Sequence, residues 1–143
     1  MKRYLFDTES DGFVATSTKV HCVSIRDVDT KEHWSYGPDQ LDIASALGKL
    51  TEADVLIGHN IQKHDIPLLT KLYGWKPKEG CLTRDTMIIA RLKHPNVKDT
   101  DTALVQAGKM PAGKKYHGKH SLASWGFRLG AVSYTHLTLP TKA

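Results

Sequence analysis

The sequence predicts an α/β fold in which a mixed sheet, three antiparallel strands plus parallel strands, is flanked by helices. Residues 3–8, 19–25 and 32–36 have strand-like patterns, and their short connections suit an antiparallel meander. Residues 39–50 place apolar side chains at helical spacing. The apolar run 54–58 has the length and composition of a strand buried on both faces. Alternating strands and helices of this kind define an α/β domain.

The chain order also predicts where the fourth strand lies. A helix between two strands favours a parallel crossover, so we expect residues 54–58 to join the sheet beside residues 3–8. The remaining expected elements are a helix whose first turn contains Pro67, a strand at 81–83, and helices at 86–92, 101–109 and 120–129. Together these elements describe a ribonuclease-H-like layout.

The composition excludes several classes of protein. The 143 residues suffice for one domain with a substantial core, and the 40% hydrophobic and 24% charged content is ordinary for a globular protein. No apolar run is long enough to span a bilayer, and the first residues lead into a strand, so we expect a cytoplasmic protein. Cys22 and Cys81 lack the spacing of a zinc ribbon, and we interpret both as reduced thiols.

Positive charge is concentrated in residues 91–120, which we call the basic segment. It holds seven Lys or Arg against two Asp, or +5, whereas the other 113 residues are formally neutral. Such a segment can attract a polyanion, most commonly nucleic acid. A solvated surface loop explains the same composition equally well, so this feature leaves both interpretations open.

Two carboxylates lie at the end of the first predicted strand. Asp7 and Glu9 are two residues apart, so their side chains should share one face. Like charges at the end of a buried strand are costly unless a cation neutralises them, and Mg²⁺ or Mn²⁺ prefers such oxygen ligands. Two solvated acids at a strand end are the alternative. Asp65, predicted at a helix N-terminus near the same end of the sheet, favours the metal site.

The ordered set Asp7-Thr8-Glu9, Gly58-His59-Asn60 and Asp65 resembles the DnaQ-like (DEDD) 3′–5′ exonuclease superfamily. Further stretches resemble the proofreading domain of short-tailed bacteriophage DNA polymerases of family A, over about residues 3–130. They are Lys19–Cys22, Lys63–Pro67, Lys98–Asp101 and Ser124–Gly130. The resemblance implies a ribonuclease-H-like 3′–5′ exonuclease that hydrolyses the 3′-terminal phosphodiester of DNA during replication.

The resemblance also implies roles for individual residues. Asp7 would bridge two Mg²⁺ ions (Mn²⁺ is the substitute), Glu9 would complete the ligands of one, and Asp65 would hold the other. The residues expected to bind substrate are Thr8, His59, Asn60, Lys114 and Lys115. Asp85 is either an outer support of the site or a helix cap, the cap being the simpler interpretation. The implied partners are the single-stranded 3′ end of DNA and the rest of a polymerase chain, in a host cytoplasm.

The sequence departs from the family pattern near its end. The superfamily has a fourth carboxylate, an Asp preceded by Tyr or His, and no acidic residue follows Gly130. We therefore expect residues 1–130 to be a C-terminally truncated exonuclease domain with low activity alone. Residues 131–143 resemble translated adapter sequence, and we interpret them as a non-native tail. An RNA-trimming exonuclease and a non-catalytic nucleic-acid-binding fragment are the alternative functions.

Overall fold

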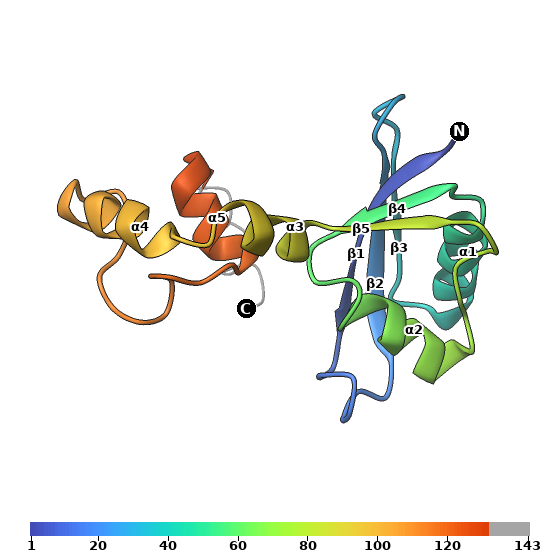
Figure 1. Cartoon of the computed structure of the whole chain (residues 1–143). Helices are drawn as coiled ribbons and strands as arrows, with labels where there is room; N and C mark the ends of the chain where they lie inside the picture. Colours follow the sequence, from blue (N-terminus) through green and yellow to red (C-terminus); the bar gives the residue numbers. More distant parts are fainter. Residues whose placement is uncertain (132–143) are drawn as a thin grey trace. The chain divides into compact units, whose positions relative to one another are not determined.

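The computed structural model describes residues 1–131. The chain divides into two compact units, the first comprising Met1–Thr86 and the second beginning at Met87. Figure 1 shows the first as a sheet with two helices and the second as a group of helices, and each is described by itself. The interpretation of residues 131–143 as a tail falls, apart from Ala131, outside the described residues.

The first unit contains a five-stranded mixed sheet with the strand order β3-β2-β1-β4-β5. The strands are β1 (Arg3–Ser10), β2 (Val20–Asp27), β3 (His33–Tyr36), β4 (Val55–Gly58) and β5 (Leu82–Asp85). Strand β1 pairs antiparallel with β2 and parallel with β4, while β2 pairs antiparallel with β3 and β4 parallel with β5. The predicted meander, and the predicted return of the fourth strand beside the first, are confirmed.

Helices α1 (Gln40–Thr51) and α2 (Asp65–Tyr73) cover one face of this sheet (Figure 1). Strand β1 turns Tyr4 and Phe6 into the core, where they join Leu50 of α1 and Leu68 of α2. The apolar positions of each helix recur at helical spacing, so burying them on the sheet removes one continuous stripe from water. This packing fixes α2 against the same strand that carries the predicted acids.

The alternation along β1 places Asp7 and Glu9 on the opposite face from the core. Tyr4, Phe6 and Thr8 are buried, whereas Asp7 and Glu9 are exposed. A strand alternates its side chains with period two, so the two acids point the same way, as the sequence predicts. Their shared face is therefore fixed by the burial of the three residues that alternate with them.

The end of β1 that carries the acids extends beyond its parallel partner. Pairing with β4 runs only from Arg3 to Leu5, while pairing with β2 continues to Ser10, with a register shift between Glu9 and Ser10. On the β4 side, the later part of β1 thus meets the chain that follows β4. This geometry brings the loop after β4 and the start of α2 to the end of β1.

The second unit is helical. Helix α3 (Thr86–Lys93) begins at the last residue of the first unit, and α4 (Val97–Gln106) and α5 (Leu122–Leu129) follow. The predicted helix 101–109 is wrong in position, because α4 begins four residues earlier, at Val97, and Asp101 lies inside it with a buried side chain. Helix α5 starts at Leu122, where the side chain of Ser121 caps it. Within residues 1–131, every helix is too short or too polar to cross a bilayer.

Candidate active site

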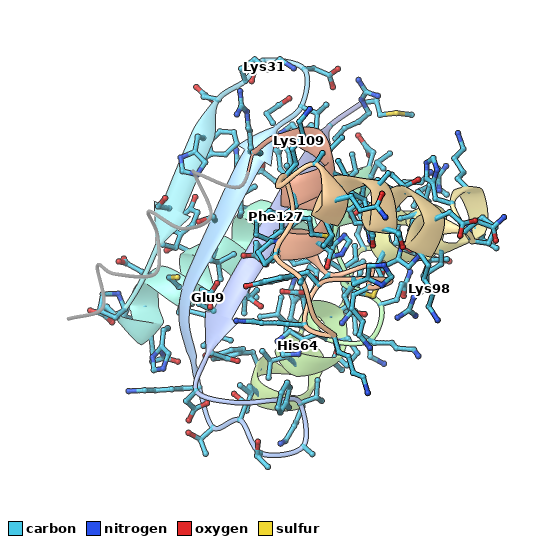
Figure 2. The ribbon with its side chains drawn as sticks, turned by 90° about the vertical axis from the view of Figure 1, so that its left-hand side faces the viewer. Glu9, Lys31, His64, Lys98, Lys109 and Phe127 are labelled. Carbon is cyan, nitrogen blue, oxygen red and sulfur yellow. The ribbon has the colours of Figure 1, made fainter. Side chains whose placement is uncertain are left out.

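Asp7, Glu9 and Asp65 all lie near the end of β1 in the first unit, Asp65 on the buried side with Thr8 and the other two on the exposed face. Asp7 and Glu9 lie on the strand, and Asp65 is the first residue of α2. The carboxylates of Glu9 and Asp65 both act electrostatically on Asp7. Figure 2 labels Glu9 on β1 and His64, the residue before Asp65, at the start of α2. The three acids therefore lie near enough to influence one another, and their shared role as metal ligands stays a prediction.

Asp65 is held directly by β1. Its carboxylate oxygen Oδ1 accepts hydrogen bonds from the backbone N–H of Thr8 at 3.1 Å and from the Thr8 hydroxyl at 2.5 Å. Only 2% of Asp65 is exposed, so both bonds are needed to offset the loss of water around the carboxylate. Thr8, predicted to bind substrate, is thus placed as the residue that positions Asp65.

Burial raises the pKa of both Asp7 and Asp65. Loss of surrounding water, reinforced by the charges of Asp65 and Glu9, raises the pKa of Asp7 to about 6, although part of its side chain reaches the surface. Burial also raises the pKa of Asp65, and the hydrogen bonds from Thr8 and the nearby His64 oppose this rise. Neighbouring carboxylates with raised pKa values mark a candidate functional site, and a bound cation would stabilise their ionised forms.

The loop between β4 and α2 completes the site's border. His59 and Asn60 lie on it, and Asn60 adopts a left-handed conformation with φ of 63°. The backbone N–H groups of Asn60 and Gln62 donate to the two oxygens of Asp85 at 2.9 and 3.0 Å. The Nδ1 atom of His59 lies 2.8 Å from the hydroxyl of Thr86. Asp85 and Thr86 therefore position His59 and Asn60, two of the residues predicted to contact substrate.

Asp85 stands at the start of a helix and also accepts hydrogen bonds from the loop after β4. It stands directly before α3, as predicted, but it is 5% exposed and accepts from the loop that carries Asn60. The sequence left two interpretations of Asp85 open, an outer support of the site and a helix cap, because an Asp before a helix has the same pattern in either role. The contact depends on β4 and β5 being neighbours, which pair Gly58 with Asp85.

Gly58 allows the loop to approach β1 closely. A Cβ atom at this position would lie 2.9 Å from the carbonyl oxygen of Phe6 and 2.3 Å from Cγ2 of Ile61. Both distances are too short for any larger side chain without movement of the backbone. Gly58 is a positioning residue that the sequence pattern places in the motif but whose role only the packing reveals.

The chemistry of the three acids fits a divalent cation of the Mg²⁺ class. They offer hard carboxylate oxygens, and a cation would offset both the burial of Asp7 and its repulsion by Asp65 and Glu9, which together raise its pKa. In this conformation, no group of three or more His, Cys, Asp or Glu side chains within residues 1–131 is arranged closely enough to hold a metal ion. The Oδ1 atom of Asp65 is instead turned toward Thr8.

The two lysines predicted to bind substrate lie in the second unit. Lys114 lines a surface pocket of about 450 Å³, with Lys98, Gly113, His117, Gly118 and Lys119. Lys115 is placed differently, with its Nζ atom 5.2 Å from the centre of the Tyr116 ring. Lys98 and Lys119 were missed as candidates in the sequence, where only their membership of the basic segment was visible. The structure brings these residues, 21 positions apart, to one pocket.

No family model matches the chain. The sequence is 41% identical over 138 residues to the DNA-directed DNA polymerase of Escherichia phage T7 and 40% identical to that of Enterobacteria phage T3. Each alignment covers 88% of this chain and 19% of the polymerase. The chain thus spans about a fifth of the length of these relatives.

Solved structures share the fold at low sequence identity. The family B DNA polymerase of Pyrobaculum calidifontis matches 94% of this chain and 23% of its own, with a TM-score of 0.52 and 15% identity. A zinc-ion-bound complex of E. coli ExoI with single-stranded DNA matches 96% of this chain and 41% of its own, at a TM-score of 0.51 and 10% identity. Brucella melitensis NrnC matches 92% and 65%, with a TM-score of 0.50 and 16% identity.

The likeness to the solved structures agrees with the sheet order. The phage sequences cover nearly the whole chain, and the solved structures share its mixed sheet and flanking helices. The chain is thus related to the N-terminal region of the phage T7 and T3 DNA polymerases and has a ribonuclease-H-like fold.

Proposed function

We propose that this chain is the metal-dependent 3′–5′ proofreading exonuclease part of a phage replicative DNA polymerase. The observation that supports the proposal is the placement of Asp7 near both Glu9 and Asp65 at the end of β1, with Asp65 anchored to Thr8. The similarity to part of the phage polymerases supports the DNA substrate. The reaction proposed is hydrolysis of the 3′-terminal phosphodiester of a single strand.

The three carboxylates are the residues that would hold two Mg²⁺ ions, or Mn²⁺ in their place. When bound, such ions supply an activated water and stabilise charge on the leaving 3′ oxygen. The protein's own contribution is to keep the acids together despite their repulsion. Burial of the residues that alternate with Asp7 and Glu9 along β1 fixes the direction of the two acids, and Thr8 fixes Asp65.

The loop after β4 is the proposed binding site for the terminal nucleotide. His59 and Asn60 would border the terminal nucleotide, and Asp85 and Thr86 keep them in place through the contacts described above. A frayed 3′ end suits a site of this kind, since an unpaired base enters with less unstacking to overcome. Rigid placement of such border residues matters because small displacements cost large factors in rate.

The fourth carboxylate of the family pattern has no counterpart after Gly130 in this sequence. We propose that residues 1–130 are the exonuclease domain without this ligand and that residues 131–143 are not its native continuation. On this view the chain alone has little activity, and a version extended with a phage-polymerase continuation is active.

The test compares the two proteins on single-stranded DNA labelled so that the released 3′ nucleotide is detected, with Mg²⁺. We expect mononucleotide release by the extended protein, a loss of at least about a hundredfold in its Asp7→Ala variant, and no loss in Asp42→Ala, which removes an exposed acid on α1. Absence of release by the extended protein, or an unchanged rate in Asp7→Ala, refutes the exonuclease. If the extended protein cleaves a matched RNA faster than the DNA, RNA replaces DNA as the proposed substrate.

A further inference from the structure

The basic pocket of the second unit is the strongest feature outside the acidic cluster. Its six lining residues include three lysines and a histidine and no acid: Lys98, Gly113, Lys114, His117, Gly118 and Lys119. We propose that this pocket binds phosphate groups of a single nucleic-acid strand. The inference rests on the proposed function only for the choice of DNA as that strand.

A buried ion pair fixes the wall of the pocket. Asp101 on α4 is fully buried, and its two oxygens accept hydrogen bonds from Arg128 of α5 at 2.7 and 2.6 Å. The same carboxylate accepts the backbone N–H of Gly118 at 2.8 Å, and Arg128 donates to the carbonyl oxygen of Lys119 at 2.7 Å. Two helices thereby hold the backbone at positions 118 and 119.

The side chains of the pocket are also positioned. Gly118 has φ of +72°, and a Cβ atom there would lie 2.9 Å from Cγ of Lys98, so the aliphatic part of Lys98 rests on the glycine. The Nε2 atom of His117 lies 3.0 Å from the hydroxyl of Thr102. A site that is ordered before binding loses less entropy when it captures a ligand than a set of free surface lysines.

Asp101, the buried acid that holds the pocket's backbone, has its own cationic partner. Burial alone would raise the pKa of Asp101, but the hydrogen bonds from Arg128 and Gly118 keep it below the ordinary value. Asp101 is thus paired with Arg128, and among the described residues no ion pair joins an acid to a lysine of the pocket. A pocket lined by lysine ammonium groups and no acid favours anions. A nucleic-acid strand carries one such anion, a phosphate, at every nucleotide.

The test measures binding of a labelled 20-nucleotide oligo(dT) to the whole chain by fluorescence anisotropy in EDTA. Each phosphate contact to a single strand contributes a salt slope of about 0.7, so losing one lysine should weaken binding about fivefold at 0.1 M salt. We expect this loss, and a slope smaller by about 0.7, for Lys98→Ala and for Lys119→Ala. Lys109→Ala, which removes the same charge from the same unit outside the pocket, should change the affinity less than about twofold.

Equal losses in Lys98→Ala and Lys109→Ala would show diffuse attraction and refute the pocket. Competition by dTMP at the same phosphate concentration as the oligonucleotide would refute the strand and assign the pocket to a free nucleotide. Circular dichroism melting of each variant separates loss of binding from loss of the fold. The binding assay contains EDTA and therefore does not depend on the metal. Loss of pocket binding and loss of exonuclease activity are thus separate outcomes, and either proposal can fail without the other.

Discussion

Thr8 and Asp65, 57 residues apart, form a two-point contact in which the backbone N–H and the hydroxyl of Thr8 donate to one oxygen of Asp65. The contact joins the end of β1 to the start of α2, at the place where β1 has passed the end of its pairing with β4. The carboxylate of Asp65 thus accepts the backbone N–H of Thr8 at a position where β1 no longer pairs with β4. The same contact sets the position of one of the three acids.

Removing the Thr8 hydroxyl should therefore destabilise the first unit and displace Asp65. Thr8→Val keeps the shape and the backbone donor but loses the bond to a charged oxygen, so we expect a loss of about 1–3 kcal/mol in the free energy of unfolding. Thr8→Ser retains the hydroxyl and should lose clearly less. Urea unfolding of both variants measures the difference. A Val variant as stable as the parent would show that the bond contributes nothing.

The raised pKa of Asp7 makes the metal-free chain less stable at neutral pH. Its pKa is about 6 in the folded state against 3.8 ordinarily, so the folded state binds more protons and stability falls as the pH rises through this interval. Asp7→Asn should remove that fall and add about 1 kcal/mol at pH 7, less than the full ~3 kcal/mol because solvent screens this partly exposed group. Urea unfolding at pH 4 and 7 tests it, and Asp42→Asn should keep the parent's slope.

Adding Mg²⁺ should reverse this penalty. A cation that binds only the folded chain stabilises it by about 1.4 kcal/mol at ten times its Kd. The gain should increase between pH 5 and 7, because Asp7 has to lose its proton before it can bind the ion. Thermal melting with and without Mg²⁺ gives the comparison. An equal shift in Asp7→Asn would place the ion elsewhere.

The left-handed conformation of Asn60 separates the roles of its backbone and side chain. Asn60→Gly accommodates φ of 63° and keeps the N–H donated to Asp85, whereas Asn60→Ala strains it by about 1 kcal/mol. We expect the melting temperature to fall in the Ala variant and to stay near the parent's in the Gly variant. If Asn60 borders the substrate, both variants of the extended protein lose exonuclease activity. Full activity in the Gly variant would refute a side-chain role.

The ion pair of the second unit should not tolerate lysine in place of arginine. Arg128 reaches both oxygens of Asp101 and the carbonyl of Lys119, and its guanidinium carbon lies 4.7 Å from the centre of the Trp125 ring. Lysine lacks the fork, so Arg128→Lys should cost about 3 kcal/mol or more and weaken oligonucleotide binding by loosening positions 118 and 119. Urea unfolding and the anisotropy assay measure both effects. Parent-like values in both would show that the pair positions nothing.

The sequence by itself determined the sheet and the direction of the acids. Alternating polarity and short connections are local properties, and they specified the meander, the return of β4 beside β1, and the common face of Asp7 and Glu9. The helix in the basic segment was misplaced, because Asp101 has the pattern of a helix start and its burial against Arg128 depends on a residue 27 positions away.

Only the tertiary structure decided which distant groups hold the sites together. The bond from Thr8 to Asp65, the support of Asn60 by Asp85 and the meeting of Lys98 with Lys119 each join residues far apart in the chain. No local pattern encodes such pairs, since they follow from which strands and helices become neighbours. The sequence thus named the acids of the candidate active site, and packing determined what positions them.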